Sequence, residues 1–280
     1  MLTLAGGAWR AVLLPDRGAA LAVLEHDGRP VLAPLPEGAN PNATWAGAFL
    51  MAPWTNRLDD GRLPYPGGEH RFPHNRVEER TALHGLSRER PWQVEEGGPD
   101  RAVLTQRIPA DGQPFAYAAR LEVRLAGGFH LALTVTNEGA EGMPFGTGWH
   151  PFFARPAGTR IDFRATGAMQ KDGRNLPVGT MATEGIAGGE EAFSGRDTHY
   201  TGWDGTARIA LGDAGYVMRA EEAWARNLQV FAPSGAGVIC VEPVSHVPDV
   251  ANRPEFAALG DMRRLRRGEA LGGRVTLRPD

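Results

Sequence analysis

The chain has little of what several functional classes need. Cys240 is its only cysteine among 280 residues, which excludes an internal disulfide framework and a cysteine-rich zinc site. Lys171 is its only lysine, so the 30 basic residues that face 33 acidic ones are almost all arginine. The formal net charge of -3 argues against a nucleic-acid or membrane-surface partner, which usually requires a basic excess.

Long apolar segments are missing as well. No run approaches the roughly 18–20 apolar residues that a membrane helix requires. The first ten residues, MLTLAGGAWR, lack the basic and apolar regions of a signal peptide. We therefore expect a cytoplasmic protein with no membrane partner.

Several catalytic motifs are absent too: a P-loop, a complete G-x-G-x-x-G, a G-x-S-x-G nucleophile elbow and H-E-x-x-H.

Turn-forming residues are abundant and evenly spread. The 37 glycines and 22 prolines mark no linker, so we expect one domain over residues 1–280. Between them lie short runs in which apolar and polar residues alternate, a period typical of β-strands. The runs are Trp9–Leu14, Ala20–Glu25, Ala102–Ile108, Leu121–Leu125, Phe129–Val135, Thr206–Leu211, Asn227–Phe231, Val238–Glu242 and Arg274–Arg278.

The turn signals and the scarcity of helical patterns indicate the fold class. Ala126-Gly127-Gly128 joins two alternating runs and predicts a hairpin. Helical periodicity is confined to a turn or two near Glu221–Ala225 and Glu255–Leu259. Many short strands without long helices predict an all-β protein, an antiparallel sandwich or barrel.

Three residues have surroundings that suit chemistry. His84 lies in ALHGLSRERPW and His150 in GTGWHPFF, each with a glycine and aromatic residues nearby. Such a histidine is either a core residue or part of a sugar cleft, where aromatic faces stack on the sugar and polar groups bind its hydroxyls. Glu242 ends the apolar run GVICVEP, and burial of a carboxylate raises its pKa, as suits a general acid or base. A salt bridge to an arginine is the alternative.

Three further residues carry no functional signal of their own. Arg57, in APWTNRLDDG, has the setting of an ordinary loop arginine. Asp197 precedes THYTGWDG and Asp204 lies within it, and either one could cap a turn.

Five segments, taken in chain order, resemble the aldose 1-epimerase (galactose mutarotase) family. They are APWTNRLDDGRLPYPGGEHRFPHNR, ALHGLSRERPW, GTGWHPFF, DTHYTGWDG and VEPVSHVPDVANRPE, and RRLRRGEALGGRVTLRP resembles the closing strand of the family. The resemblance spans the chain from about Ala52 to its end. It implies a β-supersandwich with the sugar cleft on a concave sheet face.

The same resemblance implies a role for each matching residue. His150 resembles the acid that protonates the ring oxygen, and Glu242 resembles the base that takes the proton of the anomeric hydroxyl. His84 resembles the histidine that orients the sugar. Three residues resemble contacts to the sugar: Asn56, Arg57 and Asp197, with Asp204 as the alternative to Asp197.

The implied chemistry suits these residue types. Interconversion of anomers opens the ring, rotates the bond beside the anomeric carbon and closes the ring on the other face. One carboxylate and one imidazole can exchange acid and base roles within such a cycle. We therefore expect no metal and no cofactor. The expected partner is a small sugar, with no nucleic acid, and the protein is expected to be a monomer or a homodimer.

Three alternatives remain at this stage. An epimerase of a phosphorylated or sulfonated hexose would need extra cations, and arginines occur in the relevant loops (Arg57, Arg62, Arg71, Arg76, Arg88 and Arg90). A non-catalytic carbohydrate-binding protein on the same fold would not need an acid–base pair. A glycoside hydrolase would need two carboxylates, and only Glu242 has a suitable setting.

Overall fold

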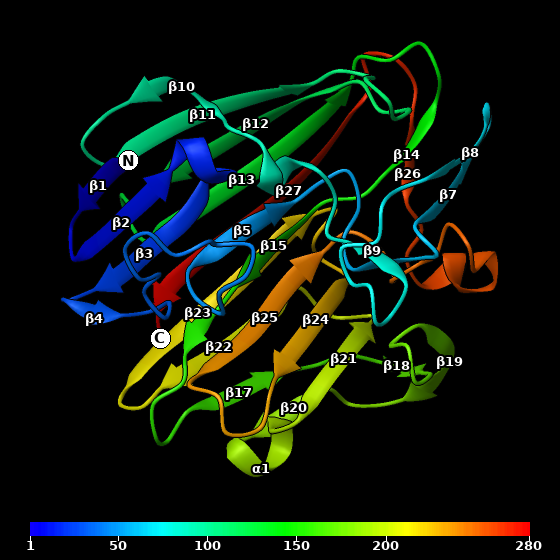
Figure 1. Cartoon of the computed structure of the whole chain (residues 1–280). Coiled ribbons are helices and arrows are strands. Elements are labelled where there is room, and N and C mark those ends of the chain that lie inside the picture. The colour runs from blue at the N-terminus through cyan, green and yellow to red at the C-terminus, as the bar shows by residue number, and fades with distance from the viewer.

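Two large antiparallel sheets make up the computed structural model, which describes residues 1–280 (Figure 1). The larger sheet has twelve strands and the smaller sheet has nine. The predicted all-β class is confirmed, and the architecture is the β-supersandwich that the resemblance implies. None of the helices is long and apolar enough to span a membrane. The cytoplasmic location stays a prediction.

The larger sheet carries the functional residues described below. Its path runs β1-β2-β3-β5-β15-β25-β24-β21-β18-β19, with β4 on β3 and β16 on β25. Its strands are β1 (Leu2–Gly6), β2 (Trp9–Leu14), β3 (Ala20–His26), β4 (Arg29–Pro30), β5 (Ala48–Met51), β15 (Gly148–Pro151), β16 (Phe153–Ala154), β18 (Gly167–Lys171), β19 (Pro177–Ala182), β21 (Arg196–Thr201), β24 (Asn227–Ala232) and β25 (Val238–Val244).

The smaller sheet packs behind the larger one, and its path runs β10-β11-β12-β13-β27-β23-β22-β17-β20. Its strands are β10 (Gln93–Gly97), β11 (Arg101–Ile108), β12 (Tyr117–Arg124), β13 (Phe129–Asn137), β17 (Arg160–Phe163), β20 (Ile186–Gly188), β22 (Thr206–Leu211), β23 (Ala214–Glu222) and β27 (Ala270–Pro279). The predicted hairpin is confirmed, since β12 and β13 pair along eight positions on either side of the glycine turn.

Short elements connect and border the sheets. Three two-stranded ribbons pair β6 (Arg57–Asp59) with β9 (Thr81–Leu83), β7 (Arg62–Tyr65) with β8 (Gly68–Arg71), and β14 (Met143–Phe145) with β26 (Arg263–Leu265). The helical elements are η1 (Pro15–Arg17), η2 (Ser87–Glu89), α1 (Glu190–Phe193) and η3 (Pro254–Leu259). The helical turn expected at Glu255–Leu259 therefore forms as part of a 3-10 helix. The one expected at Glu221–Ala225 is wrong, because Glu221 and Glu222 end β23 and a turn follows.

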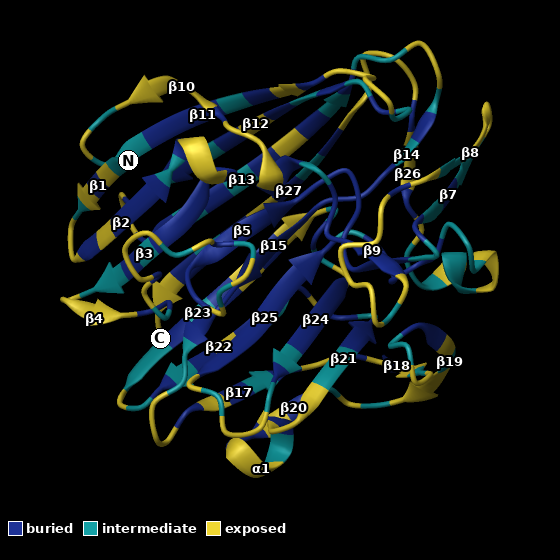
Figure 2. Cartoon of the chain, in the orientation of Figure 1, coloured by how far each residue is buried: buried dark blue, intermediate teal, exposed yellow.

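The core lies between the two sheets, and its main cluster of 63 buried residues draws on segments from Leu4 to Leu277. β25 is buried along its whole length (Figure 2). Because side chains alternate along a strand, Ile239 and Val241 enter this main core, whereas Cys240 and Val244 join a small cluster on the opposite face. The candidate site described below lies on that opposite face of the sheet.

Candidate active site

One row of side chains crosses the outer face of the larger sheet. The register of β5, β15, β25 and β24 sets Phe49, His150, Glu242 and Gln229 in line on neighbouring strands. Directly opposed residues of an antiparallel pair point to the same face, so the four side chains lie next to one another. The backbone hydrogen bonds of four strands therefore hold the row in place.

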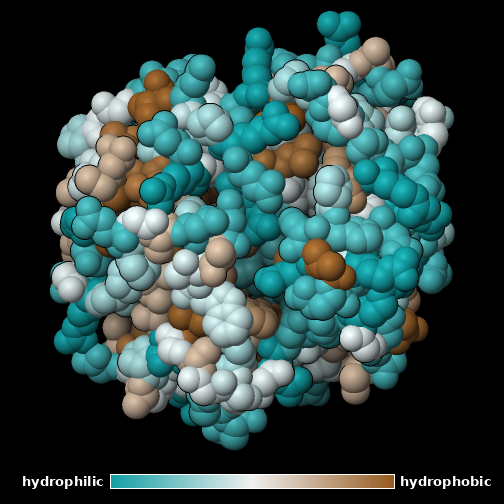
Figure 3. All heavy atoms as spheres, in the orientation of Figure 1, coloured by the Kyte–Doolittle hydropathy of each residue, from teal (hydrophilic) through white to brown (hydrophobic).

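A cleft of about 410 Å³ lies over this row. The face that Figure 3 shows is recessed near its centre, within a largely hydrophilic surface. The loop at residues 41–45 forms one wall, and residues from 75–88 form another. All six residues that the sequence pointed to line this cleft: Asn56, Arg57, His84, His150, Asp197 and Glu242.

His150 and Glu242 form a close, buried pair in the cleft. His150 Nε2 lies 3.4 Å from Glu242 Oε1, and the two side chains are 9% and 2% exposed. Burial, together with the charge of Asp197, raises the pKa of Glu242 well above its ordinary value. Burial and the nearby Arg88 guanidinium lower the pKa of His150 to about 3. A proton held by this pair therefore resides on Glu242 in the free protein.

Aromatic rings fix the orientation of His150. Phe49 stacks on its imidazole at a centroid distance of 4.4 Å, and Phe152 lies 4.6 Å away on a tilted plane. His84 meets the same ring edge-on at 5.1 Å. These contacts hold the imidazole in place, with Glu242 Oε1 as the close polar neighbour of its Nε2.

His84 is held by a reciprocal backbone contact with Asn56. The His84 N–H donates to the Asn56 carbonyl at 2.9 Å, and the Asn56 N–H donates to His84 Nδ1 at 3.2 Å. Both residues have a left-handed backbone, with φ of 67° and 56°. Burial and the neighbouring His150 lower the pKa of His84 well below its usual range. A neutral His84 that accepts at Nδ1 carries its proton on Nε2, where it is a donor in the cleft.

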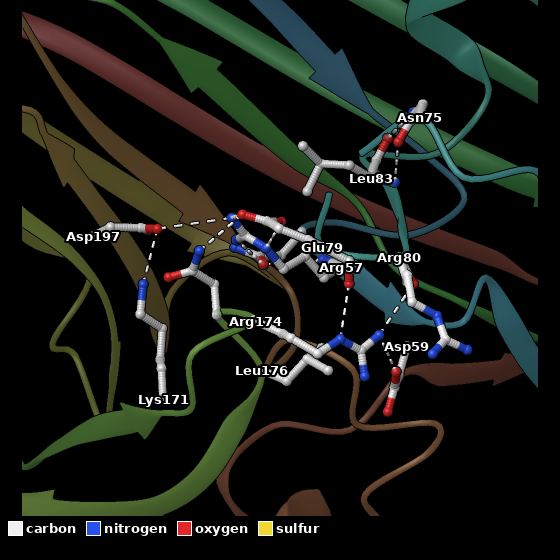
Figure 4. A network of polar contacts seen from close by, with 12 residues as sticks. Arg57, Asp59, Asn75, Glu79, Arg80, Leu83, Lys171, Arg174, Leu176 and Asp197 are labelled. Carbon is white, nitrogen blue, oxygen red and sulfur yellow. Dashed lines mark hydrogen bonds and ion pairs between the residues drawn. The ribbon is translucent and has the colours of Figure 1, made fainter. Parts of the chain in front are cut away.

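A polar network forms the far wall of the cleft (Figure 4). Arg57 donates to both carboxylate oxygens of Glu79, at 2.7 and 3.1 Å, and its Nη2 lies 3.9 Å from Asp197. Asp197 also pairs with Lys171 at 2.8 Å and accepts from Gln229 at 2.6 Å. Arg57 and Asp197 thus each have an ion-pair partner of opposite charge within the protein, and these ion pairs hold both side chains in fixed positions.

The two aspartates left open by the sequence are separated by the structure. Asp197 lies on β21 and lines the cleft. Asp204 lies in the following turn, where its Oδ1 accepts from the Thr206 backbone N–H at 3.0 Å, and it is not among the lining residues. Asp204 therefore has the turn-capping position that the sequence had offered for either residue.

Sequence reasoning missed several residues of the site. Gln229 carried a usable signal, because it is a polar residue on the alternating face of the apolar run NLQVFA. Glu79 and Lys171 carried none, since their contacts to Arg57 and Asp197 join segments far apart in the chain. Phe49 lies in a segment, Ala48–Met51, that was not among the expected strands.

A metal ion would have one candidate donor set in this site. His150, Cys240 and Glu242 offer ligand atoms that all lie within 4.8 Å of one another. Cys240 is fully buried, and burial raises the pKa of its thiol well above 9. A thiol must lose its proton to bind a metal, so this donor set does not favour one.

The comparisons with known proteins agree with this architecture. The aldose 1-epimerase family model matches residues 1–278. The uncharacterized protein YphB of Escherichia coli K12 is 29% identical over 283 residues, covering 94% of this chain and 93% of YphB.

Two solved structures are similar over nearly the whole chain. The crystal structure of a candidate aldose 1-epimerase from Escherichia coli K12 has a TM-score of 0.88 and 25% identity, and covers 100% of this chain and 98% of that one. A galactose mutarotase-like protein from Clostridium acetobutylicum has a TM-score of 0.87 at 19% identity, with 99% and 94% coverage.

Proposed function

The chain belongs to the aldose 1-epimerase family, and on that premise we propose that it interconverts the α and β anomers of a hexose by opening and reclosing the sugar ring. The observation that carries the proposal is the buried His150–Glu242 pair, 3.4 Å apart in a cleft with polar walls. The anomeric hydroxyl and the ring oxygen of a sugar are bonded to the same carbon. A carboxylate and an imidazole at this separation can therefore exchange protons with both of them at once.

The reaction balances with a single proton on the pair. In ring opening, Glu242 takes the proton of the anomeric hydroxyl while His150 gives a proton to the ring oxygen, and the bond between the anomeric carbon and that oxygen breaks. The product is an open-chain aldehyde beside a protonated Glu242 and a neutral His150. The carbonyl group then rotates by half a turn. The hydroxyl that formed from the ring oxygen attacks the carbonyl carbon from the other face. Glu242 then returns its proton to the carbonyl oxygen, and His150 takes the proton of the attacking hydroxyl.

The protonation state of the free protein matches the middle of this cycle. The raised pKa of Glu242 and the lowered pKa of His150 leave the proton on the carboxyl group, as in the open-chain stage. Reaction of a cyclic sugar first requires this proton to move to His150. A sugar hydroxyl that donates to the Glu242 carboxylate stabilises its ionised form, so substrate binding itself favours the transfer.

Other polar groups of the cleft would bind the remaining parts of the sugar. We assign His84 Nε2–H as a donor to the sugar near its ring oxygen, because the His84 ring lies 5.1 Å from that of His150, the proposed acid for that oxygen. Asn56, Arg57 and Asp197 are assigned to the sugar hydroxyls, and Gln229, between Glu242 and Asp197, joins them. Because Glu79 and Lys171 already fix this wall, binding costs little rearrangement.

Polarimetry tests the proposal directly. Freshly dissolved α-glucose and α-galactose should lose their excess rotation faster with the protein than without it. Glu242→Gln and His150→Asn should each slow this decay about 10²–10⁴-fold, the usual contribution of a general acid or base, while circular dichroism shows an unchanged fold. Full activity in either folded variant would remove that residue from its assigned role.

One observation favours a second candidate, an epimerase of a phosphorylated or sulfonated hexose. Arg88 and Arg76 line the cleft, and neither has a close carboxylate partner; the nearest to Arg88 is Glu89 at 3.9 Å, on a half-exposed side chain. Arg88 is buried, its Nε has no hydrogen-bond partner, and burial lowers its pKa to about 10. An anionic substituent would satisfy this buried cation.

Substrate competition separates the two candidates. A charged substrate is supported if glucose 6-phosphate or a 6-sulfonated glucose is turned over with a higher kcat/KM than glucose, and if Arg88→Met removes that preference. Equal or lower kcat/KM for the charged sugars supports the neutral hexose. Sugar binding without turnover of either class would support a carbohydrate-binding protein instead.

A further inference from the structure

Trp45 differs from every other tryptophan of the chain. Its exposed fraction is 51%, and it lies in the loop that precedes β5, where it lines the cleft. The six other tryptophans are at most 5% exposed: Trp9, Trp54, Trp92, Trp149, Trp203 and Trp224. A large aromatic ring that is exposed in a cleft offers an apolar face on which a sugar ring can stack.

A second aromatic ring extends the surface of Trp45. Phe231, on β24, meets Trp45 edge-on at a centroid distance of 5.4 Å, and it also lines the cleft. Phe231 is paired with Cys240, two residues along β25 from Glu242. Strand geometry places it about 8 Å from Glu242 along the sheet, from two residue rises and one strand spacing. The two aromatic rings therefore border the place of a sugar ring that is bound at Glu242, next to Asp197, which opposes Phe231 on β21.

Polar groups accompany this aromatic surface. Asn42, in the same loop as Trp45, uses its Nδ2 to donate to the Arg88 carbonyl at 3.1 Å, and its backbone N–H is bound to Asn40. These two bonds fix the amide, yet its Oδ1 is buried at the cleft without a partner. An unsatisfied buried acceptor beside an aromatic face suits a ligand that offers hydroxyl donors and apolar C–H faces.

We propose that Trp45, Phe231 and Asn42 form a second sugar subsite, and that the protein binds reducing disaccharides across the two subsites. The reducing ring lies at His150 and Glu242 with its anomeric hydroxyl free. The second ring, attached through another hydroxyl of the reducing ring, stacks on Trp45, and one of its hydroxyls donates to Asn42. The catalytic part of this assignment rests on the proposed function, but the binding part does not.

Fluorescence quenching tests the binding part alone. Because the other six tryptophans are buried, the fluorescence that acrylamide quenches readily comes from Trp45, and Trp45→Phe supplies the background. Maltose, lactose or isomaltose at saturation should protect this signal from acrylamide, and glucose or galactose at saturation should protect it clearly less. Equal protection by disaccharides and monosaccharides, or none by any of the disaccharides, overturns the subsite.

Mutarotation kinetics test its use in turnover. Trp45→Ala should lower kcat/KM about tenfold for the best disaccharide and less than about threefold for the monosaccharides. Tenfold corresponds to about 1.4 kcal/mol, which is within the range that a stacked ring contributes. Trp45→Phe should keep most of the disaccharide activity. Val94→Ala, at an exposed apolar residue on the smaller sheet, is the matched control and should change neither.

The kinetic outcomes are distinguishable from failure of the proposed function. An equal loss for both sugar classes in Trp45→Ala means that Trp45 contacts the first ring, which overturns the second subsite. If the wild-type protein turns over no sugar, the proposed function fails, and the fluorescence experiment still decides whether disaccharides bind at Trp45.

Discussion

Glu242→Gln should stabilise the folded protein while it removes turnover. Glu242 is buried, and burial together with the charge of Asp197 raises its pKa well above 4.5. A carboxyl group whose pKa is higher in the folded state stabilises the fold fully below pH 4.5. It loses that contribution as the pH rises through the folded-state pKa. Glutamine has nearly the same shape and does not titrate, so it avoids the loss.

The magnitude follows from the linkage relation. Each pH unit between 4.5 and the raised pKa lowers the free energy of unfolding of the wild type by about 1.4 kcal/mol relative to the variant. For a chain of 280 residues that corresponds to about 2–3 °C in Tm per pH unit. Which member of the His150–Glu242 pair holds the proton does not matter, because the relation counts only the number of protons bound.

Urea unfolding at pH 5, 6 and 7 measures this effect, and the difference between variant and wild type cancels the other titrating groups. Glu79→Gln is the matched control. Burial alone would raise the pKa of Glu79, but its hydrogen bonds and its attraction to Arg57 outweigh burial and lower it, so the carboxylate is ionised in both states above pH 5. That variant should be less stable by a nearly constant amount. A Glu242→Gln difference that does not grow from pH 5 to pH 7 would refute the presence of a bound proton on the pair in this pH range.

Two further substitutions test the walls of the cleft. Arg57→Ala should raise KM about 10–100-fold with a smaller change in kcat, because a hydrogen bond from a charged donor contributes about 1.5–3 kcal/mol. An unchanged KM in steady-state polarimetry would remove Arg57 from the sugar contacts. Gly85→Ala should lower the free energy of unfolding by about 1–3 kcal/mol and disturb the adjacent histidine, since φ is 73° and a Cβ would lie 2.1 Å from the Ala52 carbonyl oxygen. Gly7→Ala is the control, because Gly7 has a similar φ of 58° but a Cβ there would meet no atom within 4 Å, so this variant measures the backbone strain alone. An equal loss of stability in both variants would contradict the predicted clash between a Cβ at position 85 and the Ala52 carbonyl oxygen.

Much of the fold was readable from the sequence because alternation is a local property. The limits of β2 and β22 agree with the expected runs at both ends, and β25 extends the expected run by two residues. The helical expectation at Glu221–Ala225 failed because apolar and charged residues over one turn fit a strand end as well as a helix. At that point pairing with β27 decided the outcome.

The site was readable only in part. Glu242 and His150 were recognisable from their neighbours in the chain, but their separation of 3.4 Å depends on the register between β15 and β25. Trp45 gave no signal, because a tryptophan in a loop is as often buried as exposed. Its role depends on Phe231, which lies 186 positions further along the chain. Contacts of this kind are set by the packing of the whole fold.

The row of side chains on the larger sheet lies on paired strands, whereas the walls of the cleft lie on loops, and the two parts differ in how readily they change during evolution. His150 and Glu242 sit on central strands whose main-chain ladder tolerates no insertion, whereas the walls at residues 41–45 and 75–88 lie on loops and short ribbons. Loops accept insertions and deletions far more readily than paired strands do. Descendants of such a scaffold can therefore acquire new sugars by replacing the walls while inheriting the acid–base pair unaltered.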